Sequence, residues 1–349
     1  MIKIRQDIKE GKLNHLYLLT GEETYLRLQY RDELKKAIIG DDAMNYTLFS
    51  GKNPPVPEII DLAETLPFFQ EKRLIIIEDS GLFKAGRNAS ETEEEEAEPE
   101  SRETGSGNAS QLAAYLNEMP EYLYLVFVEE NPDKRSALYK NCKKNGYIGE
   151  FHQQDERTLC TWIRNGLFRK EGKKISDQAL MMLLDRTGSD MDLIHKECEK
   201  LFMYALNKEE VLPEDVEAVC SKQIQGQIFE LTDAIAAHRK MEALEYYYDL
   251  VATKEPNLRI LALISRQFNL LLQTKEAMSK GYGEKIVGEK IGLPPFIARK
   301  YMASARNFRS DQLRTALEQC VGTEEDIKTG RINDTLGIEM LIVSLSTSK

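Results

Sequence analysis

Short apolar runs alternate with helical patterns through the first 150 residues of the chain. The run Leu16-Tyr17-Leu18-Leu19 ends at Thr20-Gly21, and apolar residues with helical spacing follow it over residues 25–38. Runs of similar length recur at residues 46–49, 74–77, 123–128 and 147–151. Strand-sized runs that are apolar throughout, with helices between them, predict a parallel sheet covered on both faces.

After about residue 155 the pattern becomes helical only. Four helices, several preceded by Ser or Asp caps, are predicted over residues 155–168, 176–186, 191–206 and 213–220. Further helices are predicted over residues 228–237, 241–253, 258–280, 283–291, 294–307, 311–328 and 334–345. We therefore expect an α/β domain over residues 1–152, a small helical domain over 153–222 and a larger helical domain over 223–349.

The composition is that of an ordinary globular protein. The 349 residues include 42% hydrophobic and 30% charged residues, and the longest apolar runs are far too short to cross a membrane. The first residues lack a signal-peptide core, so a cytoplasmic location is expected. The five cysteines are scattered without metal-ligand spacing, which favours reduced, buried thiols and no bound metal or cofactor.

One segment concentrates much of the negative charge. Residues 86–110 contain eight Glu and two Arg, a net charge of −6 out of −11, which leaves −5 for the rest of the chain. The segment is rich in Ser, Gly and Asn and has no apolar periodicity. It is expected to form a disordered surface insertion, with an acidic recognition element as the functional alternative.

The loop after the first predicted strand lies where a P-loop NTPase carries G-x-x-x-x-G-K-[ST]. Here the register gives Gly21-Glu22-Glu23-Thr24-Tyr25-Leu26-Arg27-Leu28, so Leu26, Arg27 and Leu28 replace the second glycine, the lysine and the hydroxyl residue. The two glutamates would place carboxylates where backbone N–H groups should surround phosphates. This loop is not expected to bind ATP, and the order of elements suggests an AAA+-like domain that has lost its catalytic machinery.

Other candidate catalytic features are equally weak. Glu78 and Asp79 follow the strand at residues 74–77 like a Walker B motif, but buried strands often reach the surface through acids, and no phosphate site accompanies them. The chain has no G-x-S-x-G motif. The histidines, none of which lies in a recognisable motif, are His15, His152, His195 and His238. No intrinsic enzymatic activity is expected.

Two adjacent aromatic residues follow a helix predicted over residues 57–66. The sequence Leu66-Pro67-Phe68-Phe69 precedes the charged stretch Gln70-Glu71-Lys72-Arg73. The rings could close off the core of the sheet, as apolar side chains do in most proteins. They could instead be an exposed plug for a pocket on a partner, where aromatic anchors carry much of the binding energy.

Several short stretches, taken together in their order and spacing, resemble the bacterial DNA polymerase III delta subunit family over almost the full chain. They are Leu16-Tyr17-Leu18-Leu19-Thr20-Gly21-Glu22-Glu23, Leu66-Pro67-Phe68-Phe69 with Arg73-Leu74-Ile75, Gly188-Ser189-Asp190-Met191-Asp192-Leu193-Ile194 with Glu197 and Lys200-Leu201, Ile228-Phe229-Glu230-Leu231, Arg266-Gln267-Phe268, Lys290-Ile291-Gly292-Leu293-Pro294 with Phe296, and Lys328-Thr329-Gly330. The acidic stretch at residues 86–110 is an insertion that the family pattern does not require.

The resemblance implies an AAA+-like domain without nucleotide, a helical lid and a C-terminal helical collar. It also implies a clamp loader subunit of the DNA polymerase III holoenzyme, a nucleotidyltransferase complex, that binds and opens the sliding clamp (beta subunit). Carried over by position, Phe68 and Phe69 would enter a clamp pocket, with Leu66 and Pro67 in the same clamp-binding element. The implied partners are the clamp, the ATPase subunits and the delta-prime subunit through the collar, and primed DNA, with no membrane partner.

Two other hypotheses stay open at this point. A divergent P-loop NTPase acting on nucleic acid would need nucleotide at residues 21–28, and a general helical adaptor would have no clamp role. Basic residues that could approach DNA are Arg306, Arg309, Lys328 and Arg331, and a second cluster holds Arg164, Arg169, Lys170, Lys173 and Lys174. Residues 223–349 hold 17 basic and 16 acidic residues, so a solvated face is favoured for both sets.

Overall fold

The computed structural model of the chain describes residues 2–84, 100–220 and 224–347. It divides into two compact units, Met1–Gln153 and Gln154–Lys349. The first unit holds the predicted parallel sheet, and the second holds helices and one short strand pair. The expected domain bounds at residues 152 and 222 stay predictions.

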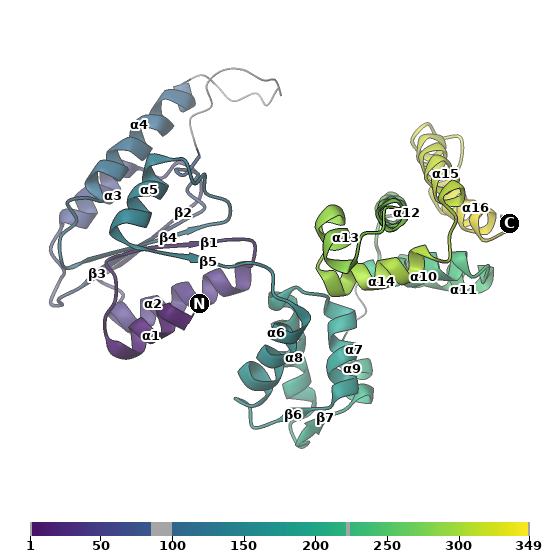
Figure 1. Cartoon of the computed structure of the whole chain (residues 1–349), viewed down its shortest axis with the longest axis horizontal. Helices are drawn as coiled ribbons and strands as arrows, with labels where there is room; N and C mark the ends of the chain where they lie inside the picture. The colour runs from purple at the N-terminus through teal and green to yellow at the C-terminus, as the bar shows by residue number, and fades with distance from the viewer. Residues whose placement is uncertain (1, 85–99, 221–223, 348–349) are drawn as a thin grey trace. The chain divides into compact units, whose positions relative to one another are not determined.

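A five-stranded parallel sheet forms the centre of the first unit (Figure 1). Its strands, all of them predicted, are β1 (Leu16–Thr20), β2 (Tyr46–Ser50), β3 (Arg73–Glu78), β4 (Leu123–Glu129) and β5 (Tyr147–Glu150). They lie in the order β2-β3-β4-β1-β5. In β1 and β4 every residue is buried, which explains why these strands lack alternation between apolar and polar positions.

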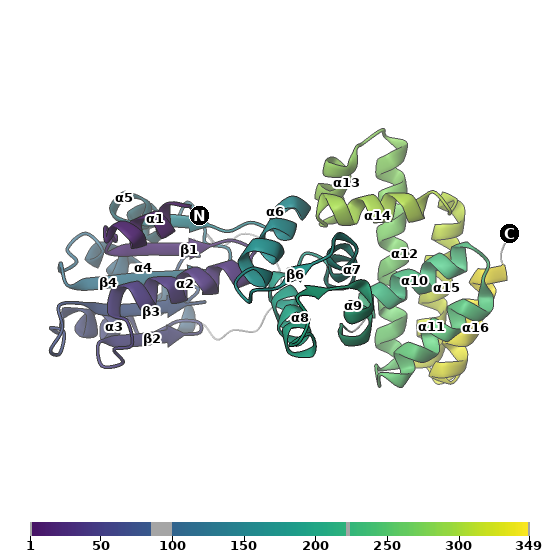
Figure 2. The ribbon, with the colours of Figure 1, turned by 90° about the horizontal axis from the view of Figure 1, so that it is seen from below.

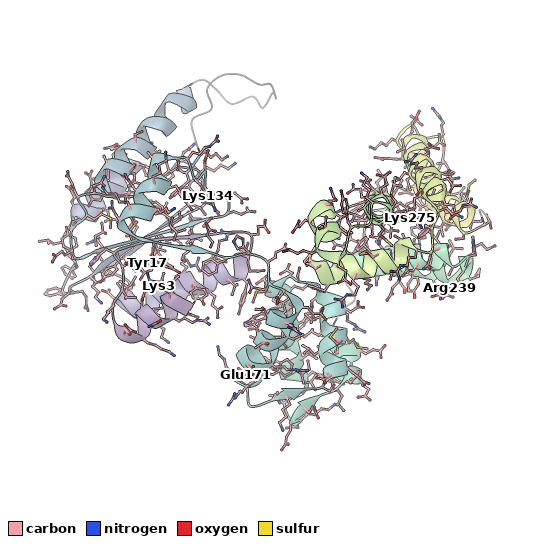
Figure 3. The ribbon with its side chains drawn as sticks, viewed as in Figure 1. Lys3, Tyr17, Lys134, Glu171, Arg239 and Lys275 are labelled. Atoms are coloured by element: carbon pink, nitrogen blue, oxygen red, sulfur yellow. The ribbon has the colours of Figure 1, made fainter. Side chains whose placement is uncertain are left out.

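Helices cover both faces of this sheet. The helices α1 (Ile2–Glu10) and α2 (Thr24–Ile39) lie on one face, and α3 (Val56–Glu64), α4 (Glu100–Tyr115) and α5 (Ala137–Asn145) lie on the other (Figures 1 and 2). Successive strand residues point to opposite faces. Leu16 and Leu18 join the core under α3, α4 and α5, whereas Tyr17, labelled in Figure 3, is fully buried and does not belong to that core.

The expectation of disorder over residues 86–110 is wrong for its C-terminal part. Helix α4 begins at Glu100, while residues 86–99 lie outside the described residues. Leu112, Ala113 and Leu116 are buried against the sheet and anchor the C-terminal half of the helix. Once such a turn is fixed, adding residues to the helix costs little, so α4 extends upstream into polar sequence.

The second unit begins with the predicted short helices. These are α6 (Glu156–Thr161), which continues into a π-helical segment (Trp162–Phe168), α7 (Asp177–Thr187), α8 (Met191–Tyr204) and α9 (Pro213–Val219). Asp155, Ser176 and Asp190 each accept a backbone N–H as N-caps, as predicted. The expectation that strands stop at residue 155 is wrong, because β6 (Lys174–Ile175) pairs with β7 (Glu210–Val211). Two-residue strands leave no hydrophobic period to detect.

The remaining helices lie in the C-terminal part of the second unit, and all but one build a large core. They are α10 (Ile224–Ala236), α11 (Lys240–Ala252), α12 (Asn257–Ser279), α13 (Glu284–Ile291), α14 (Pro295–Ala305), α15 (Ser310–Lys328) and α16 (Asp334–Thr347). Each corresponds to a predicted helix. The long helix α12 contributes Ile260, Ile264, Phe268 and Leu271 to this core, spaced three to four residues apart on one face. The exception is α13, which packs in a smaller cluster with residues of α12 and α14.

Three further expectations concern the cysteines, membrane-spanning helices and metal ions. All five cysteines are free and four are buried, and desolvation raises the pKa of Cys142 to about 12. In the described part of the chain, no helix is long and apolar enough to cross a membrane. The same residues contain no group of three or more His, Cys, Asp or Glu side chains that could hold a metal ion.

Candidate functional site

The two aromatic residues singled out in the sequence lie on the surface. Residues 66–69, called the tip below, connect α3 to β3. Leu66 is 72% exposed, Phe68 is 52% exposed and Phe69 is 89% exposed. The two rings contact each other edge to face, with their centroids 4.4 Å apart. The core interpretation of the two rings is therefore wrong, and the chain presents a paired aromatic surface that water surrounds.

The backbone of the tip is held by one buried side chain. Asn45, which directly precedes β2, is 1% exposed. Its Oδ1 accepts the N–H of Phe68 at 2.7 Å, and its Nδ2 donates to the carbonyl of Phe68 at 2.9 Å. The amide thus pairs with both backbone groups of the same residue, as a neighbouring strand would. The main-chain carbonyl of Asn45 also accepts the N–H of Leu74 at 2.9 Å, so Asn45 joins the tip to the sheet.

Two further side chains support the start of the tip. Tyr122 donates its hydroxyl hydrogen to the carbonyl of Glu64, the last residue of α3, at 2.9 Å, and Thr65 is the C-cap of that helix. The buried Arg73, the first residue of β3, donates to the carbonyl of Leu66 at 3.1 Å. Sequence analysis identified the tip and placed Arg73 in a stretch shared with the family, but it missed Asn45, Tyr122 and the contact that Arg73 makes. A lone polar residue beside an apolar strand gives no local signal, and the contacts of Asn45 and Tyr122 join residues far apart in the chain.

One residue of the tip has an unfavourable backbone conformation. Phe69 has φ = +53°, in the left-handed region that residues with a Cβ rarely adopt. Such a conformation costs free energy and persists only where surrounding contacts impose it. Here the hydrogen bonds of Asn45 to Phe68 fix the residue immediately before it.

The loop after β1 packs closely against the chain that follows β5. The N–H of Gly21 donates to the carbonyl of Glu130 at 3.0 Å, and the N–H of Glu23 donates to the carbonyl of Phe151 at 3.1 Å. A Cβ placed on Gly21 would lie only 2.1 Å from that carbonyl oxygen. The chain after β5 thus occupies the loop, and two of its N–H donors are already used. Glu23 is buried, whereas Glu22 is exposed.

The acids that follow the strands have structural partners. Glu78, the candidate Walker B acid, forms an ion pair with Arg31 of α2 at 2.6 Å. Glu129, at the end of β4, is buried and accepts hydrogen bonds from the N–H and the hydroxyl of Ser80. Desolvation raises the pKa of Glu129, which the Ser80 hydrogen bonds oppose. The structural interpretation of the acid after β3 is supported by the pairing with Arg31.

Most of the basic candidates are paired within the chain. Lys328 pairs with Glu324 at 2.6 Å, and Arg331 pairs with Asp326 at 2.8 Å. Lys173 donates to the backbone carbonyls that end α8, the nearest at 2.6 Å from Ala205. These pairs fit the solvated-face interpretation. His15 and His238 each contact a backbone carbonyl through Nδ1, which supports a structural role for both.

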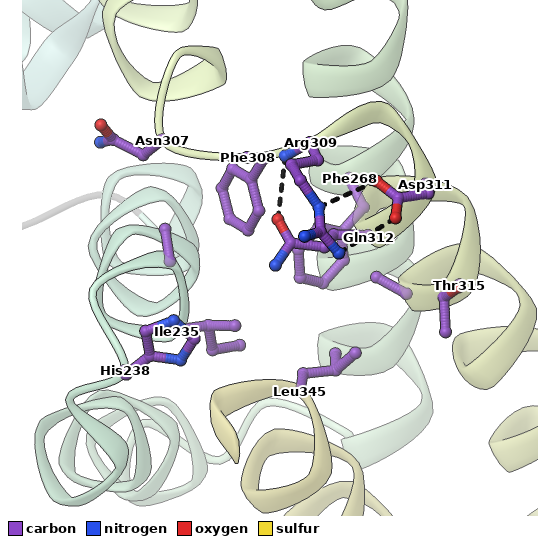
Figure 4. A pocket seen from close by; sticks show the side chains of 12 residues that line it. Ile235, His238, Phe268, Asn307, Phe308, Arg309, Asp311, Gln312, Thr315 and Leu345 are labelled. Atoms are coloured by element: carbon purple, nitrogen blue, oxygen red, sulfur yellow. Dashed lines mark hydrogen bonds and ion pairs between the residues drawn. The ribbon is translucent and has the colours of Figure 1, made fainter. Parts of the chain in front are cut away.

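A cavity of about 200 Å³ lies among α10, α12, α15 and α16 (Figure 4). Its floor is apolar and includes Phe268, Phe308 and Leu345. At its rim Arg309, another basic candidate, forms an ion pair with Asp311 at 3.1 Å. The guanidinium is therefore directed toward the start of α15.

Fold and site together define a class of protein: a parallel-sheet α/β domain with an exposed aromatic tip, joined to helical segments. A model of the family "DNA polymerase III, delta subunit" matches residues 17–151, and a model of its C-terminal domain matches residues 225–345. The chain belongs to the DNA polymerase III delta subunit family. The expected fold class, a parallel-sheet α/β domain followed by helical segments, is confirmed.

Individual relatives agree with this assignment. The chain is 28% identical to DNA polymerase III subunit delta of Bacillus subtilis, a match that covers 97% of this chain and 95% of the relative. It is 22% identical to a probable DNA polymerase III subunit delta of Aquifex aeolicus, over 86% and 83% of the two chains. The solved structure of the Bacillus subtilis DNA clamp loader delta protein matches with a TM-score of 0.71 and 27% identity, over 99% of both chains.

Proposed function

We propose that this chain is a clamp loader subunit that binds the sliding clamp through the tip and opens it. The observation that carries the proposal is the pair of exposed rings, Phe68 and Phe69, on a backbone that the protein itself holds in place. Aromatic anchors presented on an ordered backbone can bind without a large loss of conformational entropy. Burying two such rings supplies roughly 3–6 kcal/mol of gross transfer free energy.

The mechanism follows from differential affinity. ATPase subunits of the loader change conformation when they bind ATP and thereby expose the tip to the clamp. If the tip binds the open ring more tightly than the closed ring, binding shifts the clamp toward the open state. The chain itself contributes no ATP chemistry in this scheme, which the filled loop at Gly21 supports.

The proposal includes the architecture and partners expected from the family. Residues 153–222 would form the lid domain and residues 223–349 the collar, which would contact the ATPase subunits and the delta-prime subunit. Primed DNA would approach the assembled complex in the cytoplasm. Within this scheme the acidic segment upstream of α4 has no assigned role.

The test is equilibrium binding between the full chain and the sliding clamp of the same organism. Phe68→Ala/Phe69→Ala should weaken binding at least about 30-fold, a loss of roughly 2 kcal/mol typical of aromatic anchors. A matched control is Met203→Ala/Tyr204→Ala, which removes two side chains that are 72% and 57% exposed in the second unit. Equal binding by wild type and the Phe68/Phe69 variant would refute the proposal.

A second measurement addresses the alternative that the chain is a divergent P-loop NTPase. Labelled ATP is titrated into the isolated chain, and no saturable binding is expected because the loop carbonyls and side chains leave no phosphate site. Binding that is lost on changing residues 21–28 would favour a nucleotide-dependent enzyme instead.

A further inference from the structure

We propose that Asn45 is a positioning residue that sets the orientation of the two tip rings for clamp binding. The inference rests on the proposed function and deepens it. Asn45 belongs to no stretch that identified the family. Its influence passes through the backbone of Phe68.

The hydrogen-bonding chemistry fixes which way the Asn45 amide faces. The N–H of Phe68 can only donate, so the atom of Asn45 that faces it is the oxygen. The nitrogen then faces two acceptors, the carbonyl of Phe68 at 2.9 Å and the carboxylate of Asp42 at 2.6 Å. A flipped amide would place its oxygen against both acceptors and its nitrogen against a donor. A single orientation therefore satisfies all three contacts.

Asp42 completes this arrangement from the loop between α2 and β2. Its other carboxylate oxygen accepts the N–H of Met44 at 2.8 Å, which holds the carboxylate in place. The hydrogen bonds from Asn45 and Met44 also lower the pKa of Asp42, so the carboxylate stays ionised at neutral pH. Asn45 is thus fixed from one side by Asp42 and from the other by the start of β2.

The location of Asn45 explains why it would matter for binding. Without the amide, the N–H and carbonyl of Phe68 would bond to water, and the tip would populate many backbone conformations. Only the fraction with the rings in the bound arrangement could engage a pocket, so the apparent affinity falls by that fraction. Loss of the two hydrogen bonds to Phe68 predicts clamp binding weaker by roughly tenfold to a hundredfold.

The first test needs no clamp. In the free chain, hydrogen exchange at the Phe68 amide should be slowed in wild type and should approach the rate of an open loop in Asn45→Ala. Equal exchange rates in the two chains would overturn the inference. Asn141→Ala is the matched control, because Asn141 also donates from its amide to a backbone carbonyl, that of Ala113, away from the tip.

The second test is a double-mutant cycle with the clamp. Asn45→Ala should weaken binding in wild type, and it should have no further effect in Phe68→Ala/Phe69→Ala, because the rings it positions are absent. An equal loss in both backgrounds would mean that Asn45 acts elsewhere, which overturns the inference. If the Phe68/Phe69 variant weakens binding and Asn45→Ala does not, the proposed function stands and the positioning role is wrong.

A charge exchange supplies a rescue that a merely space-filling role would not show. Asn45→Asp keeps the acceptor for the Phe68 N–H but places a second carboxylate beside Asp42, so clamp binding should weaken. Adding Asp42→Asn restores a donor between the two positions and should recover part of the affinity. Absence of any recovery, with both variants folded, would count against the arrangement. Loss of binding by the Phe68/Phe69 variant remains the separate criterion for the proposed function.

Discussion

The backbone conformation of Phe69 predicts that glycine at this position gives a more stable protein than alanine, which is the reverse of the usual order. In most positions, replacing Ala by Gly destabilises a protein by roughly 0.5–1 kcal/mol, because glycine loses more conformational freedom on folding. Phe69 has φ = +53°, where a residue with a Cβ is strained and glycine is not. Comparing Phe69→Gly with Phe69→Ala therefore isolates the backbone, since both variants lack the ring.

The magnitude follows from two opposing effects. A left-handed conformation destabilises the folded alanine variant by roughly 1–2 kcal/mol. The greater flexibility of glycine in the unfolded chain destabilises the glycine variant by about 0.5–1 kcal/mol. The free energy of unfolding of Phe69→Gly should accordingly exceed that of Phe69→Ala by about 0.75 kcal/mol at the middle of both ranges, and by up to about 1.5 kcal/mol. Loss of the ring itself has little effect on the comparison, because the side chain is 89% exposed in the free chain and is removed from both variants.

Urea unfolding followed by circular dichroism and by tyrosine fluorescence gives the required comparison. The transition to compare is the unfolding of the first compact unit. It is recognised as the transition whose midpoint shifts when a residue of the five-stranded sheet is substituted. Both variants should bind the clamp poorly, since neither carries the ring. If Phe69→Ala is as stable as Phe69→Gly or more stable, the left-handed backbone does not exist in solution, and the preformed tip loses its support.

Three further outcomes test other parts of the structure. Gly21→Ala should destabilise the first unit by roughly 2–5 kcal/mol, because its Cβ would lie 2.1 Å from the carbonyl oxygen of Phe151; Gly81→Ala, at φ = +70° with open space around it, measures the backbone contribution alone in the same urea assay. Burial raises the pKa of Glu129, so its contribution to stability is lost as pH rises above about 4.3, the ordinary value, through the raised folded value; the melting temperature of Glu129→Gln relative to wild type should increase from pH 4 to pH 7, and a constant difference would contradict this. Cys160, which alone among the cysteines is half-buried, should react first with a thiol reagent in the native protein, as mass spectrometry of the labelled peptides would report.

The sequence was sufficient to predict strands that form continuous apolar runs and helices whose apolar spacing persists over many residues. The five strands and the long helix α12 followed from burial that spans whole elements, which leaves an unambiguous pattern. The pair β6–β7 and the start of α4 at Glu100 were not predictable in this way. Two residues have no period, and the polar start of α4 depends on an anchor further along the chain.

The site was predictable only in part, for a related reason. Phe68 and Phe69 stand out because two large apolar rings follow a helix end and a proline, yet their sequence does not tell exposed from buried rings. Asn45 could not be found at all, since its partner lies 23 residues away and the contact uses the backbone of Phe68. A side chain that bonds only to the backbone of a loop does not restrict which residues that loop contains.

The sheet separates the loop after β1 from the proposed binding surface. In a parallel sheet all strands start at one edge and end at the other. Gly21, Glu78 and Glu129 lie at or after the strand ends. Asn45 precedes β2, and the tip precedes β3 at the opposite edge. Strands of five or six residues place these edges roughly 17–20 Å apart, so changes in the loop after β1 need not disturb the tip.

This geometry also determines where a force on the tip would act. The tip is connected through Asn45 to the start of β2 and to Leu74, and through Arg73 to the start of β3. β2 pairs with β3 along the whole length of β2. In β3 every residue except Glu78 is buried. A partner bound to the rings would therefore pull on a cooperative, buried sheet rather than on a compliant loop. That rigidity is what a subunit needs if binding energy at two rings is to strain the interface of another protein.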